Sequence, residues 1–221
     1  VGFGFGGVPS SSTLEHAEHA FAARNAPLQF EVSTLADPEM ARSLTRRGYE
    51  LVGFENVLGI AITPTLVERL EGVDPASNEV RAASADESSA WMETVTTGFL
   101  HPDVYDGPPS HESVNREVLE RIFGDTLAAP GFERFLGWPD GEIAGGASFR
   151  TQDGVAQLSG AATVPAHRRH GVQSALLRYR LLEGARRGCD VAVVTTTPGS
   201  KSQENVQKAG FALLYTRAVL V

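Results

Sequence analysis

Residues 163–177 read TVPAHRRHGVQSALL, and the interpretation of the whole chain depends on them. An apolar strand pattern ends here, and the apolar stripe of a helix over 171–187 begins at once. A helix start presents backbone N–H groups and the positive end of the helix dipole, and Gly171 lets a ligand approach the backbone closely. Basic side chains oppose the dipole at this end, and an anionic ligand such as a pyrophosphate would remove that conflict; the alternative is an ordinary solvated helix start. Three basic or titratable residues directly precede the glycine: Arg168, Arg169 and His170.

A second copy of the surrounding pattern lies near the start of the chain. Residues 28–58 align without a gap with residues 190–220, at an offset of 162 positions, and both copies read as strand, helix, glycine and strand. The same offset places an expected helix over 13–25 on residues 175–187. Residues 6–11, GGVPSS, then fall on the basic turn. The fold therefore does not itself require positive charge at that position, which favours a ligand.

The ends of the repeated helices carry recognisable signals. Asp37 followed by Pro38 is a helix start, and residues 200–203, SKSQ, form a capping box. Gly48 and Gly210 are expected to end the two helices as C-terminal glycines.

The remaining sequence predicts a mixed α/β unit. Residues 72–78, GVDPASN, resemble a linker, so we expect a first, partial unit over 1–71 and a second, complete unit over 78–221. Three antiparallel strands joined by Asp-Gly turns then lead into a parallel crossover, which gives a mixed sheet. The expected elements are a strand over 78–84, a helix begun by the capping box of Ser84 and Glu87, a loop over 101–113, a helix over 114–128, and strands over 132–138, 142–151 and 155–164.

Once the turn is placed between a strand and a helix, it resembles the acetyl-CoA motif of the GNAT (general N-acetyltransferase) superfamily. The family pattern is Arg/Gln-x-x-Gly-x-Gly/Ala, which Arg168 and Gly171 match. Gln173 stands where a second small residue is usual, which alters the fit of the turn without removing its amides. The strand order over 78–220 resembles the same fold. The resemblance implies a GNAT acyl-CoA N-acyltransferase fold, preceded by a degenerate GNAT-like unit as in tandem members of the superfamily.

The resemblance also implies a reaction and a binding site. An acetyl group would pass directly from acetyl-CoA to a primary amine of a small molecule or peptide. The end of the preceding strand would contact the pantetheine arm, and the amides of 169–174 would hold the pyrophosphate. Asn205 would contact the cofactor arm or be a solvated helix residue. The residues expected to bind acetyl-CoA are Ala162, Thr163, Val164, Arg168, Arg169, His170, Gly171, Val172, Gln173, Ser174 and Asn205.

The expected general acid is missing. Many members of the family place a tyrosine four residues before a Gly-Phe pair, and Val206 occupies that position here. Tyr215 on the last strand is the candidate catalytic substitute, and a packed strand aromatic is the alternative. The absence of the usual tyrosine motivates a second hypothesis, a non-catalytic acyl-CoA-binding or sensing module.

Several other residues have a chemical and a structural interpretation. His16 and His19 have no third ligand nearby, so a solvated face is expected and no metal is predicted. Cys189 is expected to be a small buried residue rather than a nucleophile. Glu55 falls on Arg217 in the repeat, with no decisive role indicated. In the family, the loop over 101–113 borders the acceptor pocket, where acidic groups suit a cationic amine, although loops are polar in any case. Its candidates are Asp103, Tyr105, Asp106, His111 and Glu112.

Composition limits the partners. The net charge of −8 disfavours nucleic acid, which the patch at 168–170 could otherwise bind. A single cysteine excludes an intrachain disulfide and fits a cytoplasmic location, and no apolar run approaches a membrane span. We expect acetyl-CoA or CoA and an amine as partners, with a homodimer as a further option. The first residue is not Met, and we expect the natural N-terminus to lie upstream.

Overall fold

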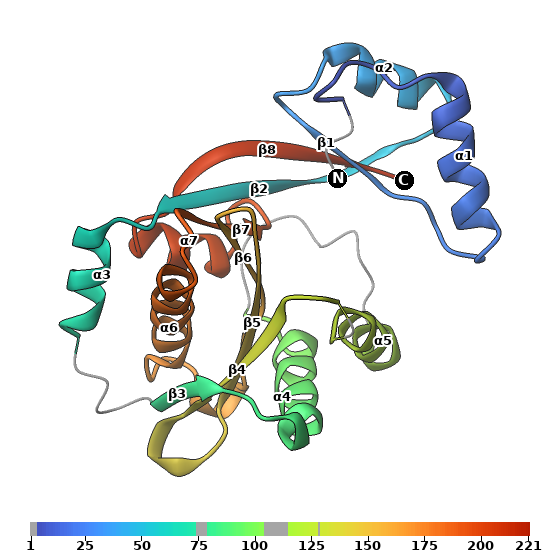
Figure 1. Ribbon diagram of the computed structural model, residues 1–221. Helices are drawn as coiled ribbons and strands as arrows, with labels where there is room; N and C mark the ends of the chain where they lie inside the picture. Colours follow the sequence, from blue (N-terminus) through green and yellow to red (C-terminus); the bar gives the residue numbers. More distant parts are fainter. Residues whose placement is uncertain (1–3, 74–78, 104–114, 128) are drawn as a thin grey trace.

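The computed structural model describes residues 4–73, 79–103, 115–127 and 129–221, which form one eight-stranded mixed sheet with helices on both faces (Figure 1). The strand order is β1-β8-β2-β7-β6-β5-β4-β3, and every neighbouring pair is antiparallel except β6 and β7. This confirms the expected α/β class with a mixed sheet. The strands are β1 (Phe30–Ser33), β2 (Leu51–Ala61), β3 (Glu79–Ala82), β4 (Phe132–Trp138), β5 (Gly145–Gln152), β6 (Val155–Thr163), β7 (Val191–Thr196) and β8 (Ala212–Leu220). The helices are α1 (Ser11–Ala22), α2 (Pro38–Arg46), α3 (Pro64–Glu71), α4 (Ser88–Leu100), α5 (Arg116–Leu127), α6 (Val172–Arg186) and α7 (Lys201–Lys208).

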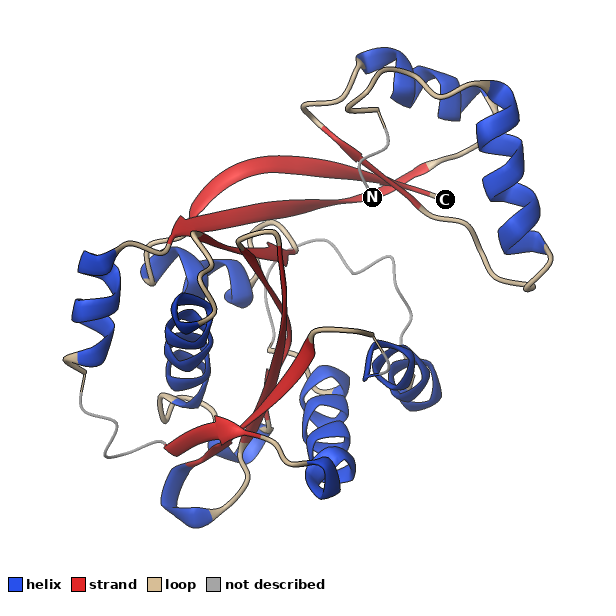
Figure 2. Cartoon of the chain, viewed as in Figure 1, coloured by secondary structure: helices blue, strands red, loops and turns tan. Residues whose placement is uncertain are grey.

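Helices α4 and α6 cover opposite faces of the sheet, as two successive glycines of β5 show. A Cβ atom on Gly145 would meet Val172 of α6, and one on Gly146 would meet Val95 of α4. Because successive strand residues point to opposite faces, the two helices lie on opposite sides. Figure 2 shows α3, α6 and α7 on one side of the central strands and α4 and α5 on the other.

Most helix ends follow the sequence signals. The side chain of Asp37 accepts a hydrogen bond from Glu39 N, and Ser200 accepts one from Gln203 N. Ser84 and Glu87 form the expected capping box, although it opens a short 3-10 turn that leads into α4. Gly48 and Gly210 have positive φ after α2 and α7.

Several elements differ from those expected. Helix α1 begins at Ser11 because Ser10 caps it by accepting a hydrogen bond from Thr13 N. Strand β5 begins at Gly145 because the residues before it first form a short 3-10 turn over Pro139–Gly141. Helix α3 was not predicted, although Thr63 followed by Pro64 is the same kind of helix start as the one before α2.

The two copies of the repeat interlock within the sheet. At the offset of 162, β1, α2 and β2 correspond to β7, α7 and β8, and α1 corresponds to α6. Strand β2 of the first copy lies between β7 and β8 of the second, while β8 lies between β1 and β2. Glu55 pairs in register with Arg217, which is its own equivalent in the repeat, so a pseudo-twofold axis passes through this pair.

The interlocked strand β2 also contributes to the main core. Leu58 of β2 is fully buried in one cluster with Phe135 of β4 and Leu176 of α6. A second cluster, which contains Leu14 and Met40, packs α1 and α2 on the far end of the sheet. Each copy of the repeat therefore completes the packing of the other. Within the described residues, every helix is too short or too polar to span a bilayer.

Candidate functional site

The two parallel strands at the centre of the sheet separate at their carboxyl ends. Pairing between β6 and β7 runs from Val155 opposite Val191 to Leu158 opposite Val194 and then stops. Strand β6 continues to Thr163 along β5, and β7 continues to Thr196 along β2. A gap therefore opens between two strands whose outer edges remain paired.

A β-bulge in β6 lies where the strands separate. Ser148 of β5 is paired with Ser159, but Gly146 is paired with Ala162, so β6 carries an extra residue between these pairs. Gly160 has a φ of +54°, and a Cβ atom there would lie 2.8 Å from Ser148 Oγ. Glycine is required for both reasons.

The turn over residues 164–171 follows the end of β6, one of the two strands that border this gap. Arg169 has a φ of +66°, which is uncommon for a residue with a side chain, and Gly171 has a φ of +82° as the residue before α6. Five backbone N–H groups of the turn and of the start of α6 donate no hydrogen bond to another described residue: those of Arg169, Gly171, Val172, Gln173 and Ser174. These donors lie at the positive end of α6, which is the geometry that binds phosphate groups.

The side chain of Arg168 is part-buried and bonded to backbone carbonyls, unlike the exposed side chains of Arg169 and His170. Its guanidinium donates hydrogen bonds to Thr163 O at 3.3 Å, to Gly98 O at 3.4 Å and to His101 O. It also pairs with Asp103 at 3.3 Å. Arg168 thus ties the end of α4 to the end of β6, whereas the side chains of Arg169 and His170 are exposed.

Two hydroxyl groups lie unpaired beside the gap. Thr163 Oγ1 and Thr196 Oγ1 are buried and have no hydrogen-bond partner within the described part of the chain. Thr163 lies opposite Gly145, where a side chain would point to α6. Thr196 lies opposite Asn56, whose side chain donates a hydrogen bond to Gln203 of α7. Both hydroxyls therefore face the α6–α7 side of the sheet, one from each strand that borders the gap.

The predicted general acid lies farther from the gap. Tyr215 of β8 is opposite Val57 of β2, which is opposite Thr195 of β7, so two strand spacings of about 4.8 Å separate Tyr215 from β7. Its ring packs edge-on against Phe5 at 6.4 Å between centroids. Its role as an acid stays a prediction. So does cofactor contact by Asn205, which is half-buried on α7.

A charged cluster that the sequence did not predict lies on the sheet near Tyr215. Arg217 pairs with Glu31 at 2.6 Å and with Glu55 at 2.5 Å, and it donates to Thr195 Oγ1 at 3.4 Å. The side chain of Arg217 is only 16% exposed. The partners of Arg217 come from β1, β2 and β7, so only the folded sheet reveals the cluster.

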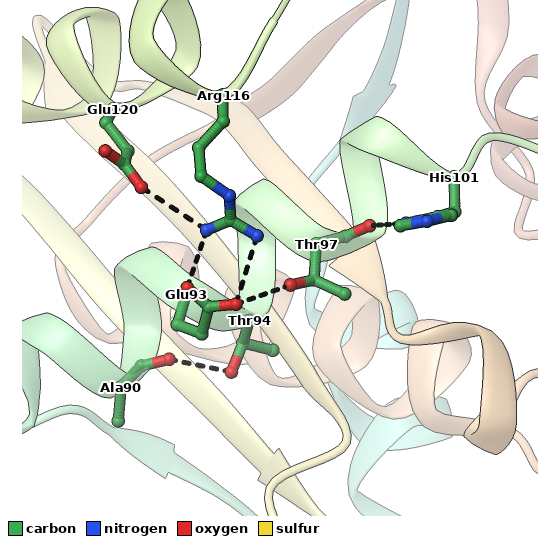
Figure 3. Close-up of polar contacts among 7 residues, drawn as sticks. All are labelled: Ala90, Glu93, Thr94, Thr97, His101, Arg116 and Glu120. Carbon is green, nitrogen blue, oxygen red and sulfur yellow. Dashed lines mark hydrogen bonds and ion pairs between the residues drawn. The ribbon is translucent and has the colours of Figure 1, made fainter.

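A second unpredicted network joins α4 to α5 (Figure 3). Arg116 pairs with Glu93 at 2.7 Å and with Glu120 at 3.3 Å, and Thr97 donates a hydrogen bond to Glu93 at 2.9 Å. The bonds from Arg116 and then Thr97 lower the pKa of Glu93. A carboxylate whose pKa is lowered is a weak general base at neutral pH, so Glu93 is a poor candidate for proton transfer. The contacts of Arg116 with Glu93 instead join α4 to α5.

The other candidates have the following positions. Cys189 is buried, which confirms the expectation of a small buried residue, and burial raises the pKa of its thiol. Val206 is 3% exposed in the main core. Among residues 4–73, 79–103, 115–127 and 129–221, no three His, Cys, Asp or Glu side chains are grouped as metal ligands. Asp103 contacts Arg168, and the remaining loop candidates lie outside the described residues: Tyr105, Asp106, His111 and Glu112.

Comparison with known families gives the class of the protein. The model of the acetyltransferase (GNAT) family matches residues 100–211, which include the bulge, the gap and the turn. This match covers half of the chain, and the chain belongs to the GNAT acetyltransferase family. The comparison with curated proteins gave no match.

Solved structures agree with this fold along nearly the whole chain. A GCN5-related N-acetyltransferase from Kribbella flavida is 21% identical over 94% of this chain and 72% of its own, with a TM-score of 0.67. One from Sphaerobacter thermophilus is 17% identical over 95% and 66%, with a TM-score of 0.61. A tandem GNAT protein from the clavulanic acid biosynthesis pathway is 14% identical over 95% and 68%, with a TM-score of 0.63. The first half of the chain is thus part of the shared fold.

Proposed function

We propose that the protein transfers an acetyl group from acetyl-CoA to a primary amine of a small molecule or peptide. The observation that carries this proposal is the gap between β6 and β7, which ends at a helix start with free backbone donors. The family match supports acyl transfer in general. The identity of the acyl donor and of the amine is our inference.

The groups around the gap fit acetyl-CoA in three places. The N–H groups of Arg169, Gly171, Val172, Gln173 and Ser174, which donate no hydrogen bond to another described residue, suit the pyrophosphate. The hydroxyls of Thr163 and Thr196 have no hydrogen-bond partner among the described residues, and they suit the amides of the pantetheine arm. From Ala162 to Val164 the strand is paired with β5 and its neighbours on one side. Toward the gap, Thr163 O accepts a hydrogen bond from Arg168, and the rest of this side is left for the same arm.

The proposed reaction needs a neutral amine and a polarised thioester. The amine lone pair attacks the carbonyl carbon, and the carbonyl oxygen takes up the negative charge. Collapse of this intermediate breaks the C–S bond and releases the CoA thiolate. The nitrogen loses one proton and the thiolate gains one, so the products are an amide and free CoA. Tyr215 is our candidate donor of the thiolate proton, from the side of the sheet that carries Arg217.

A second function is favoured by the burial of Val206 at the position of the usual tyrosine. Without an acid, the same site would bind acyl-CoA without turnover and act as a sensing module.

Thiol release separates the two functions. The purified protein is incubated with acetyl-CoA and a panel of small primary amines and peptides, and free CoA is followed with a thiol reagent. Amine-dependent release supports the transferase. Tight binding of acetyl-CoA with no release for any amine supports the sensing module, and a lack of binding contradicts both.

A further inference from the structure

A buried arginine lies directly behind the bulge in β6. Arg180 of α6 is 2% exposed, and its guanidinium donates hydrogen bonds to Leu176 O at 3.2 Å, Ser148 O at 3.1 Å and Ser159 O at 3.4 Å. In the part of the chain that the structure describes, no carboxylate forms an ion pair with it. Burial lowers the pKa of Arg180 to about 10, so the side chain still carries its charge at neutral pH. An unpaired buried cation is unfavourable, so its position calls for a specific explanation.

Both strand carbonyls that Arg180 binds belong to the last residue pair before the bulge. Ser148 and Ser159 are partners in register, and Ser148 Oγ also donates to Ser159 O at 3.0 Å. Ser159 directly follows Leu158, the last residue of β6 that is paired with β7. Arg180 and Ser148 together therefore fix the peptide at which β6 leaves its parallel neighbour.

The fold does not require an arginine at this helix position. At the offset of 162, the equivalent of Arg180 is Glu18 on α1. Glu18 is part-exposed and pairs with Arg47 at 2.7 Å. The buried cation therefore belongs to the copy that has the bulge, the gap and the basic turn.

The Ser159–Gly160 peptide carries the effect of Arg180 toward the gap. In a trans peptide the carbonyl and the N–H group point in opposite directions, and the described peptides include no cis bond. A cation on the carbonyl polarises the peptide and makes its N–H a stronger donor. Gly160 is paired with no residue of β5 or β7, so this N–H lies outside both ladders.

We propose that Arg180 is a positioning residue for acyl transfer, which fixes the Ser159–Gly160 peptide and strengthens the Gly160 N–H as a donor to the thioester carbonyl oxygen. The inference rests on the proposed function, because it places the acyl group at the gap. The negative charge that develops on the carbonyl oxygen is stabilised by this N–H, and Arg180 acts through the peptide without touching the substrate.

The first test removes the charge and keeps the volume. In Arg180→Met we expect an intact fold, an unchanged affinity for CoA and a KM for acetyl-CoA within about twofold of the unmodified protein. We expect kcat to fall about 10-fold, less than the roughly 100-fold loss when an oxyanion donor is removed outright. The matched control is Arg178→Met, on the same helix, where the guanidinium donates to Leu70 O at 2.9 Å, and it should keep kcat.

The second test uses a cation that can titrate. Desolvation lowers the pKa of a buried lysine, so in Arg180→Lys the side chain is charged at low pH and becomes neutral as pH rises. The kcat of Arg180→Lys relative to the unmodified protein should therefore fall with increasing pH toward the level of Arg180→Met. A side chain that only fills space gives a ratio that does not depend on pH.

The third test does not depend on turnover. The infrared stretch of the thioester carbonyl is measured for bound acetyl-CoA labelled with carbon-13 at the acetyl carbonyl. The stretch should lie at lower frequency in the unmodified protein and in Arg178→Met than in Arg180→Met. If Arg180→Met does not fold, the same comparison is made with Arg180→Lys at high and low pH.

The outcomes separate this inference from the proposed function. An active unmodified protein whose kcat, pH ratio and carbonyl frequency are unaffected by these substitutions overturns the role of Arg180 and leaves the transferase in place. An inactive protein that binds acetyl-CoA and shows the frequency shift contradicts the transferase and retains the role of Arg180 in polarising the carbonyl. A protein that does not bind acetyl-CoA overturns both.

Discussion

At the scale of single residues, the buried hydroxyls of Thr163 and Thr196 are expected to lower the stability of the free protein and to raise its affinity for a ligand. A buried hydroxyl without a partner costs about 1–3 kcal/mol of stability. A ligand that supplies the missing hydrogen bond removes this cost when it binds. Stability of the free protein and affinity for the ligand should therefore respond in opposite directions when the hydroxyls are removed.

This opposition can be measured with Thr163→Val combined with Thr196→Val. We expect the free energy of unfolding of the free protein to rise by about 1–2 kcal/mol and the dissociation constant for acetyl-CoA to rise about tenfold. Urea denaturation and calorimetric titration measure the two quantities. Thr96→Val is the control, because Thr96 on α4 is fully buried and its hydroxyl has no partner in the described part of the chain, but it is not at the end of β6 or β7. Unchanged affinity in the double variant would contradict contact between these hydroxyls and the ligand.

For single residues of the site, the sequence predicts features whose parts are adjacent in the chain and not those that join distant residues. The turn was predictable because a basic stretch, Gly171 and the start of a helix are adjacent in the chain. The actual partners of Arg168, at Gly98 and His101, were not predictable because they are about 70 residues away in sequence. Arg180 gave no signal either, because a basic residue on a helix usually faces solvent and its burial depends on the packing of α6 against the bulge.

At the scale of elements, the start of α6 separates helix stability from ligand binding. A negative side chain near a helix N-terminus stabilises the helix through its dipole but repels a phosphate. Gln173 lies in the first turn of α6 and provides one of the free N–H groups. A single substitution there can therefore favour the fold and oppose the ligand.

We expect Gln173→Glu to keep or raise the melting temperature and to weaken acetyl-CoA binding at least about tenfold. The added carboxylate would repel the phosphate, and a tenfold weakening corresponds to about 1.4 kcal/mol. Gln152→Glu makes the same change at the exposed end of β5 and should leave the affinity unchanged. Comparable weakening in both variants would mean that overall charge, rather than the turn, governs binding.

Elements were easier to predict than their arrangement. Caps at Asp37, Ser84 and Ser200 lie next to the helices that they begin, so local sequence identified these starts. Helix α3 was missed although Thr63 and Pro64 mark its start and Leu66 and Leu70 have the spacing of an apolar helix face, because it is only two turns long. The position of β2 between β7 and β8 was not predictable, because strand order is set by contacts between distant parts of the chain.

At the scale of the whole molecule, the pair of Glu55 and Arg217 lies where the two copies of the repeat meet. It joins equivalent positions of the repeat across the pseudo-twofold axis, and Glu31 binds the same guanidinium. Because Arg217 is largely buried, a second cation beside it cannot be screened well by solvent.

Glu55→Arg should therefore lower the free energy of unfolding by about 1–3 kcal/mol, through loss of a charged hydrogen bond and gain of repulsion. Chemical denaturation measures the loss. The control is Glu50→Arg, which makes the same change at an exposed residue just before β2. Equal stability of the two variants would show that the pair on the axis contributes no more than surface charge.

The interlocked strands also bear on how such a chain can arise and change. A protein with one copy of the repeat could form the same pairing only between two separate molecules, and identical residues would then meet on the axis. Duplication within one gene removes that identity, so one position can become acidic and the other basic. The first copy can then have an uncharged segment, GGVPSS, where the second has a basic turn. It cannot lack its last strand, because β2 is paired with β7 and β8 of the second copy.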